Sequence, residues 1–162
     1  LISNELNNFT EERNGFFEQK SEDKLLFKDK LEIKNVNFVY PGLDISVFKD
    51  LNFILKKGDI VFLYGEIGVG KTTFIRNLIN NFQKKKNLNL TEITSPTFNI
   101  VNEYEIKDLT IQHYDLFRLK DESELKNIGL LENTNAFITF VEWPEIITKK
   151  NINTRPYHPI SI

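Results

Sequence analysis

The chain has 162 residues, of which 40% are hydrophobic and 27% are charged, and its formal net charge is −2. These values are typical of a soluble globular domain with its own core, and the charge gives no general attraction to nucleic acid or to an anionic membrane. The chain contains no cysteine and only two histidines, which excludes disulfides and thiolate metal sites and leaves little for a zinc site. No apolar run approaches the roughly 18 residues of a spanning helix, so we expect a cytoplasmic protein.

Composition divides the chain into three parts. Residues 1–30 are rich in Asn, Glu and Lys and predict a weakly ordered leader. Residues 31–150 carry the periodic segments of one domain, whereas residues 151–162 have no clear pattern and predict a loop or tail. The chain begins at Leu1 and contains no methionine, which indicates a fragment or a processed piece.

Two strands are predicted before the most informative stretch of the chain. Residues 31–36 alternate between apolar and polar, residues 47–55 are rich in apolar side chains, and Tyr40 opens a turn between them. Together with residues 57–59, this region resembles the opening of an ABC-type ATPase domain. In that family an aromatic residue at the place of Tyr40 stacks on adenine; the alternative is a strand-end aromatic that packs on the core.

A phosphate-binding loop is predicted next, because the sequence G-E-I-G-V-G-K-T-T matches G-x-x-x-x-G-K-[ST]. The candidate nucleotide-binding residues of this loop are Gly65, Glu66, Ile67, Gly68, Val69, Gly70, Lys71, Thr72 and Thr73. The glycines let backbone N–H groups surround a polyphosphate. Lys71 can reach the β and γ phosphates, and the Thr72 hydroxyl can ligate Mg²⁺.

The loop has the flanking elements that the motif requires. Residues 60–64 form a short apolar run of the buried-strand type. Apolar residues then recur at helical spacing over residues 74–82, so the start of a helix would point at the phosphates. The lysines at 84–86 are interpreted as cations at the helix end, with a phosphate or RNA contact as the alternative.

Two later segments contribute candidate site residues. Residues 95–98 form a hydroxyl-rich turn before a strand at 99–104, and Thr97 could sense a γ-phosphate or Mg²⁺ unless the turn is an ordinary one. In a strand over residues 109–118, Ile111, His113, Asp115 and Phe117 would share one face. Asp115 beside His113 would suit Mg²⁺ or water positioning; the alternative is a surface acid and a buried histidine with satisfied hydrogen bonds.

The last informative stretch is a strongly apolar strand at residues 136–141 that ends in Glu142. A carboxylate at the end of a buried strand is the Walker-B arrangement, which holds Mg²⁺ or orients the attacking water. The alternative is a solvated acid. Trp143 would cover the site or anchor the loop.

A short capped helix is expected from residue 121 to Ile128. The expected fold is an α/β P-loop NTPase with a mainly parallel sheet flanked by helices.

Five elements follow the order and spacing of the TsaE (YjeE) family, small bacterial P-loop ATPases that serve tRNA threonylcarbamoyladenosine synthesis. They are the loop at 65–73, S-P-T-F at 95–98 with N-E-Y at 102–104, H-Y-D-L-F-R at 113–118, E-L at 124–125 with G-L at 129–130, and E-W-P-E at 142–145. Family members usually open with a short helical segment and continue past E-W-P-E with further strands. This chain instead has the ABC-like stretch and the unpatterned tail.

The resemblance implies an ATPase that binds ATP and Mg²⁺ and hydrolyses ATP slowly alone. It would reset the TsaD–TsaB complex, which modifies adenosine 37 of tRNAs reading codons that begin with A, and would meet tRNA only through that complex. By motif position, Lys71 holds the phosphates and Thr72 the metal. Asp115 and Glu142 lie at the Mg²⁺ and the water, which makes Lys71, Asp115 and Glu142 the candidate catalytic residues. Thr97 lies in the switch-like loop.

Two other functions stay open on the sequence alone. An ABC-type nucleotide-binding subunit of a transporter fits residues 31–73, but the chain has no L-S-G-G-Q-like segment and no apolar strand ending in Asp-Glu. A nucleotide-dependent binding module without meaningful hydrolysis fits the same site residues.

Overall fold

The structure, a computed structural model, describes residues 30–39, 46–106, 109–130, 132, 136–148, 150–152 and 155–162. All of the expected leader except Lys30 lies outside these residues, and so does Tyr40, whose two interpretations stay open.

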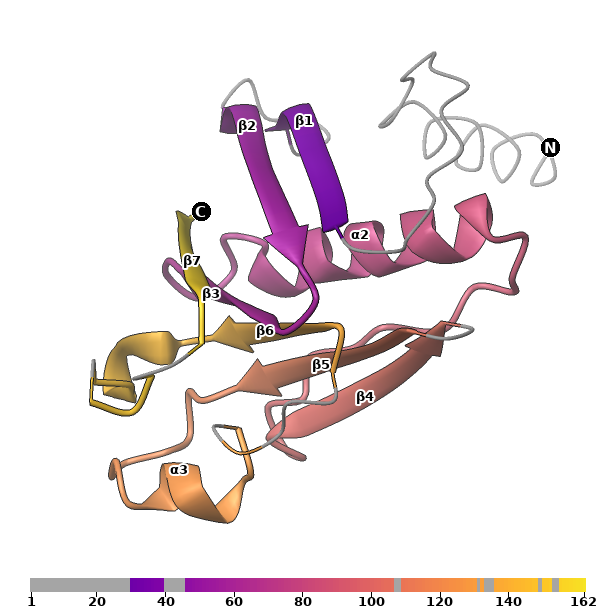
Figure 1. Cartoon of the computed structure of the whole chain (residues 1–162). Helices are drawn as coiled ribbons and strands as arrows, with labels where there is room; N and C mark the ends of the chain where they lie inside the picture. The colour runs from indigo at the N-terminus through magenta and orange to yellow at the C-terminus, as the bar shows by residue number, and fades with distance from the viewer. Residues whose placement is uncertain are drawn as a thin grey trace, which may run out of the picture.

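Ten elements make up the described part of the chain (Figure 1). They are β1 (Lys30–Val39), β2 (Ser46–Lys56), β3 (Asp59–Tyr64), α2 (Lys71–Lys85), β4 (Val101–Ile106), β5 (Leu109–Asp115), α3 (Glu124–Asn127), β6 (Ile138–Glu142), the 3₁₀ helix η2 (Pro144–Ile146) and β7 (Tyr157–Ser161). The predicted strands before and after the phosphate loop, the helix that follows the loop and the short helix α3 are confirmed.

A five-stranded sheet in the order β4-β5-β6-β3-β7 forms the centre of the domain. The four strands β5, β6, β3 and β7 run parallel, and β4 pairs antiparallel with β5. The prediction of an α/β fold with a mainly parallel sheet is therefore confirmed. β1 and β2 form a separate antiparallel pair.

Both faces of the central sheet are covered by apolar side chains. Along β3, Val61 and Leu63 belong to one buried cluster with α2, whereas Ile60 and Phe62 belong to another on the opposite face. A parallel strand that is buried on both faces reads as a continuous apolar run. This is why residues 60–64 were recognisable as a strand from sequence.

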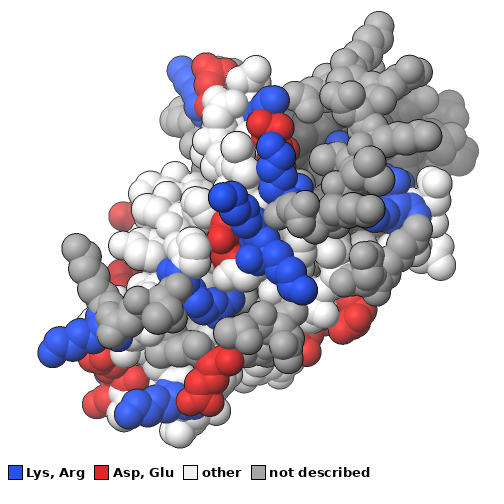
Figure 2. Space-filling view, viewed as in Figure 1, with Lys and Arg blue, Asp and Glu red and all other residues white. Residues whose placement is uncertain are grey.

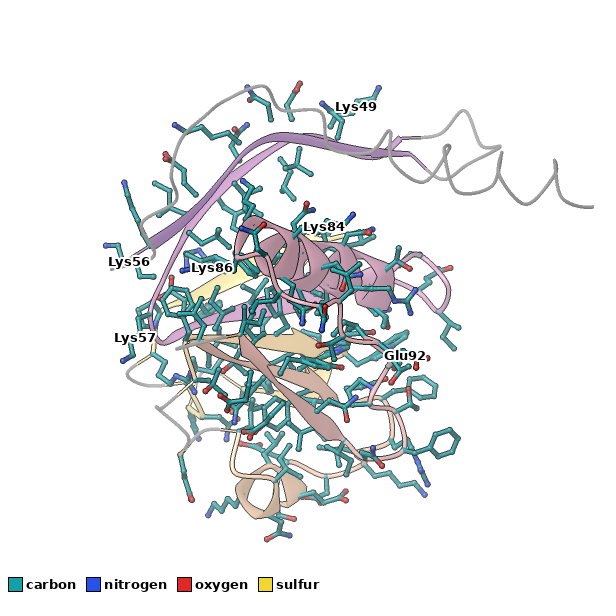
Figure 3. All side chains as sticks on the ribbon, turned by 90° about the vertical axis from the view of Figure 1, so that its right-hand side faces the viewer. Lys49, Lys56, Lys57, Lys84, Lys86 and Glu92 are labelled. Atoms are coloured by element: carbon teal, nitrogen blue, oxygen red, sulfur yellow. The ribbon has the colours of Figure 1, made fainter. Side chains whose placement is uncertain are left out.

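Helix α2 lies between the central sheet and the β1–β2 pair (Figures 1 and 3). Its apolar side chains at helical spacing, among them Ile75, Ile79 and Phe82, join a cluster that also contains Leu31 and Leu55 from the paired strands. The helix ends in Lys84 and Lys85. Cations at this end meet the negative pole of the helix dipole. This interaction explains the lysine run, so that no bound phosphate or RNA is needed to explain it.

The expectation of a loop or tail at residues 151–162 is wrong for Tyr157–Ser161, which form strand β7 beside β3. The segment escapes recognition because Ile160 is its one buried apolar residue and Pro159 lacks an N–H donor. Proline is tolerated here because β7 is an edge strand. Non-local contacts stabilise the strand, including a 2.8 Å hydrogen bond between His158 Nε2 and Asp59 Oδ2.

None of the helices in the described residues is long and apolar enough to span a membrane.

The packing of α2 gives a stability prediction. Ile79 is fully buried, so Ile79→Ala should lower the free energy of unfolding by about 2–5 kcal/mol, because it removes apolar contacts and leaves a cavity. Ile54, which is 41% exposed, provides the matched control: Ile54→Ala should stay within about 0.5 kcal/mol of wild type. Urea unfolding measures both values, and equal losses would contradict the assignment of the core.

Candidate functional site

A cavity of about 470 Å³ opens where the start of α2 faces the carboxyl ends of β5 and β6. Its lining residues are Ile67, Gly68, Gly70, Lys71, Thr72, Thr73, Ser95, Thr97, Asp115, Phe117, Glu142 and Trp143. The carboxyl ends of parallel strands meet at one edge of a sheet, where ligands commonly bind in α/β folds. The volume lies within the range of about 300–1,000 Å³ typical of small-molecule sites.

The loop at residues 65–73 contains three glycines with positive φ, at positions 65, 68 and 70. Gly70 caps α2 with a left-handed φ of 101°, which a residue with a side chain adopts at a cost. The first turn of α2 contains no acidic residue. The positive pole of the helix dipole therefore faces the cavity without a neighbouring carboxylate from its own first turn.

Gly65 is required for a steric reason. Its φ is +139°, and a Cβ atom at this place would lie 2.7 Å from the backbone oxygen of Ile162 and 2.9 Å from Cγ2 of Val69. The loop therefore passes directly against the end of the C-terminal strand, since Ile162 N–H also donates to the Tyr64 carbonyl at 3.0 Å. β7, which the sequence analysis missed, thus supports the position of the loop.

Lys71 is 4% exposed and turns back toward its own loop. Its Nζ donates to the carbonyl oxygens of Gly65 at 2.7 Å and Glu66 at 2.9 Å, and lies 3.8 Å from the centre of the Trp143 ring. Burial lowers the pKa of Lys71, and the nearby carboxylates of Glu142, Asp115 and Glu145 partly oppose this shift.

Glu142 ends β6 and is 3% exposed, so the alternative of a solvated acid is wrong. Its Oε1 accepts a hydrogen bond from the Thr72 hydroxyl at 2.7 Å and lies 2.8 Å from His113 Nε2. One carboxylate oxygen thus connects the first turn of α2 with β5 and β6.

Asp115 lies next to Glu142, because the two are register partners at the ends of β5 and β6. It is 3% exposed, which contradicts the alternative of a surface acid. Its Oδ2 accepts hydrogen bonds from Ser95 Oγ at 2.8 Å and Thr97 Oγ1 at 2.6 Å, and its Oδ1 accepts from the Phe117 N–H at 3.0 Å. The turn at residues 95–98 is therefore bonded directly to the strand end.

Two aromatic side chains border the cavity beyond these strand ends. Trp143 has a left-handed φ of 57°, and its ring lies 5.0 Å from that of Phe117, centre to centre. β5 ends at Asp115, so the expectation that Phe117 continues this strand is wrong: Phe117 is half exposed in the following turn. Trp143 both borders the cavity and packs on a neighbouring ring, which agrees with both interpretations of this residue.

A scan of the chain against protein-family models matches residues 45–162 to the model described as threonylcarbamoyl adenosine biosynthesis protein TsaE. The chain belongs to the TsaE family. The resemblance found in the sequence is confirmed, and TsaE membership implies the P-loop fold. The ABC-like interpretation of residues 31–73 gains no support from this match. The match assigns residues 45–73, together with the rest of the candidate site, to the TsaE family.

Curated relatives described as tRNA threonylcarbamoyladenosine biosynthesis protein TsaE include those of Rickettsia felis, Borreliella burgdorferi and Bacillus subtilis. The R. felis protein is 41% identical over 108 residues, covering 67% of this chain and 60% of the relative. The B. burgdorferi protein is 33% identical, covering 75% and 80% of the two chains, and the B. subtilis protein is 37% identical, covering 59% and 56%. The chain thus spans less than two thirds of several TsaE relatives.

A solved structure of Bacillus YdiB aligns with 65% of this chain and 60% of its own at 26% identity, with a TM-score of 0.39. A TM-score this low does not support an argument about the site.

Most of the TsaE-like residues predicted from sequence lie together. Lys71, Thr72, Thr97, Asp115 and Glu142 all line the cavity. From the loop itself, Gly65 and Glu66 line an adjoining open pocket instead, and Val69 lines neither. The roles assigned to these residues stay predictions.

Two residues at the site were not assigned to it in advance: Ser95 and Phe117. His113 was named from sequence as the neighbour of Asp115, with which it shares a strand face, but it received no role of its own. Ser95 belongs to a recognised turn, but its hydrogen bond to Asp115 depends on a contact across 20 residues. Phe117 was expected within the strand and not at the cavity.

The donor set fits a magnesium nucleotide. Mg²⁺ prefers hard oxygen ligands, is usually held by one or two carboxylates and keeps several waters. The Thr72 hydroxyl and the Asp115 and Glu142 carboxylates supply such oxygens at one cavity. The described residues contain no cluster of three or more His, Cys, Asp or Glu side chains that could hold a metal ion.

The contact between the loop and the C-terminal strand can be tested through stability. Gly65→Ala should destabilise the protein by about 2–4 kcal/mol, because the added Cβ meets the Ile162 backbone and the backbone conformation is strained. Gly129→Ala is the control: φ there is +67° with open space around the Cβ position, so strain alone costs about 1 kcal/mol. Chemical unfolding of both variants measures the difference, and equal losses would show that the contact with Ile162 is loose.

Proposed function

We propose that this chain is an ATP-binding and ATP-hydrolysing subunit of the tRNA threonylcarbamoyladenosine machinery, acting on the TsaD–TsaB complex. The observation that carries the proposal is the convergence of Lys71, Thr72 and Glu142 at one cavity in a member of the TsaE family. The Thr72–Glu142 hydrogen bond of 2.7 Å supports it, because a P-loop hydroxyl beside a strand-end acid is the arrangement that holds a metal nucleotide.

Phosphate binding would use the loop and the start of α2. The N–H groups of the loop and the positive helix pole attract anions. Lys71 Nζ would exchange the carbonyls of Gly65 and Glu66 for phosphate oxygens, so that its positive charge meets a full negative charge instead of a carbonyl dipole.

Metal binding would use Thr72, Asp115 and Glu142. Held by these residues, Mg²⁺ would neutralise part of the phosphate charge. The two carboxylates carry negative charge at adjacent strand ends, so a cation between them would relieve their mutual repulsion. Thr97, bonded to Asp115, would transmit the state of the site to the turn at residues 95–98.

Hydrolysis would depend on positioning and charge. Glu142 or Asp115 would orient a water toward the γ-phosphoryl group, and Lys71 would stabilise the charge on its oxygens. Trp143 and Phe117 would limit access of bulk water at the cavity border. The candidate catalytic residues are therefore Lys71, Asp115 and Glu142.

The partner would bring tRNA to the chain. On the face shown in Figure 2, several basic side chains lie close together across the middle, with acidic side chains among and around them. With a net charge of −2, the chain has little general attraction for RNA. We therefore propose that tRNA is met through the TsaD–TsaB complex, in the cytoplasm, and that ATP turnover resets this complex.

A nucleotide-dependent binding module without meaningful hydrolysis is the second candidate. The same cavity and site residues fit it, since holding a metal nucleotide does not by itself require its hydrolysis. In this candidate the acids would tune nucleotide affinity and partner docking.

Phosphate release with and without TsaD–TsaB distinguishes the two candidates and tests the proposed function. Lys71→Ala should reduce ATP turnover by about 100-fold or more, because the phosphates lose their charged donor. Lys84→Ala, which removes an exposed lysine from the far end of the same helix (Figure 3), should leave turnover unchanged. Wild-type turnover in the Lys71 variant would remove the mechanism, and no release under either condition would favour the binding module.

The lowered pKa of Lys71 gives a pH prediction. Only the protonated amine attracts phosphate, so the affinity for Mg–ADP should fall as pH rises through the pKa of the free protein. This fall should begin below the ordinary lysine value of 10.5, with a slope of at most about tenfold per pH unit. Dissociation constants measured between pH 7 and pH 11 check this, and Lys84→Ala should show the same profile. An affinity that begins to fall only above pH 10.5 would contradict it.

A further inference from the structure

His113 lies in the middle of the site, but the proposed function gives it no role. It is fully buried on the face of β5 that packs toward α2, two residues before Asp115. Its Nε2 is 2.8 Å from Glu142 Oε1. Its Nδ1 is also buried and has no hydrogen-bond partner in the part of the chain that the structure describes.

This arrangement is costly for a residue that only fills space. A buried polar atom without a partner typically costs about 1–3 kcal/mol. Ile111, two residues earlier on the same face, shows that this face of β5 accepts an apolar side chain. A histidine with one nitrogen unpaired therefore requires a reason, and the contact with Glu142 is the hydrogen bond it makes.

The direction of that bond follows from the acceptor. A carboxylate that binds a cation, as the proposed function requires of Glu142, has no proton to give, which puts the hydrogen on Nε2 of His113. Glu142 Oε1 then accepts two donors, one from β5 and one from the Thr72 hydroxyl on α2. Two donors from different elements on one oxygen fix the rotation of the carboxylate more firmly than either donor alone.

The two donors to Glu142, the Thr72 hydroxyl and His113 Nε2, differ in whether they would also contact the bound cation. Under the proposed function the Thr72 oxygen also binds the cation, so its position follows the nucleotide. His113 Nε2 bonds to Glu142 from the rigid interior of the sheet, between the neighbouring strands β4 and β6. The histidine can therefore hold the carboxylate in one orientation whether or not nucleotide is present.

We propose that His113 is a positioning residue that fixes the Glu142 carboxylate through its Nε2–H, so that Glu142 faces the metal and water without rearranging during turnover. The inference rests on the proposed function and adds a residue to it. A group of this kind, which orients a ligand without touching the metal, typically contributes 10–100-fold to activity or metal affinity.

Two substitutions separate the hydrogen bond from the packing. His113→Leu keeps the bulk and removes the donor, whereas His113→Gln places an amide N–H near the position of Nε2. His113→Leu should lower kcat for ATP about 10–100-fold while the dissociation constant of ADP measured without Mg²⁺ stays within about twofold, and His113→Gln should restore most of the rate. Gln112→Leu is the matched control, since Gln112 is equally buried in β5 but bonds to Glu103, away from the cavity.

His113→Asn is used if the leucine variant does not fold. Its shorter amide cannot reach Glu142, so it should lose the rate that His113→Gln retains. Equal turnover in wild type, His113→Leu and His113→Asn would overturn the inference and leave the proposed function standing. Parallel loss of nucleotide binding and turnover in all His113 variants would also overturn it, because that pattern reports damage to the whole site.

A measurement without ATP separates the inference from the proposed function. The chain has two histidines, so ¹⁵N imidazole spectra of the free protein contain two ring systems, and His158→Asn assigns them. The His113 ring should carry its proton on Nε2, and its signals should shift in Glu142→Gln. If this bond is present but the wild-type chain neither binds nor turns over nucleotide with TsaD–TsaB, the proposed function fails and the positioning role fails with it. If the proton is on Nδ1, the inference alone fails.

Discussion

The hydrogen bond from the Thr72 hydroxyl to the Glu142 carboxylate is the contact on which the site depends, because it joins the phosphate loop to the sheet. It connects the first turn of α2 with the last residue of β6, across 70 residues of sequence. The parallel register places Asp115 beside Glu142, and so brings the turn at residues 95–98 to the same cavity. Without this alignment the lysine, the hydroxyls and the two acids would be separate surface groups.

Burial gives these groups their chemical character. Charged and polar side chains lose solvation inside a protein and must find partners, and the partners then fix their geometry. Lys71 illustrates the balance: burial lowers its pKa, nearby carboxylates oppose the shift, and two backbone carbonyls hold the amine. His113 illustrates the cost, since its second nitrogen stays unpaired. Several groups of the site are thus already hydrogen-bonded without a ligand, which favours a mechanism based on positioning.

Elements whose evidence is local were predicted well. The apolar run of β3, the glycine-rich loop and the helical spacing of α2 each follow from neighbouring residues, and the sequence placed all three. β7 was missed because one buried isoleucine and an internal proline do not make a strand pattern, and only pairing with β3 stabilises it. The sequence likewise could not determine whether Asp115 and Glu142 are buried, because the residues around a strand-end acid follow the same pattern whether the acid faces water or a cavity.

The sequence by itself determined the chemistry available to this protein: a phosphate loop, two strand-end acids and the motif order of the TsaE family, all of which depend on residue type and spacing. Tertiary structure decided which of these groups share a cavity. It also revealed that His113 bonds to Glu142 and that the C-terminal strand presses against Gly65. The physical reason is that hydrogen bonds and steric contacts act over a few ångströms in space, whereas the residues that make them are separated by tens of positions along the chain.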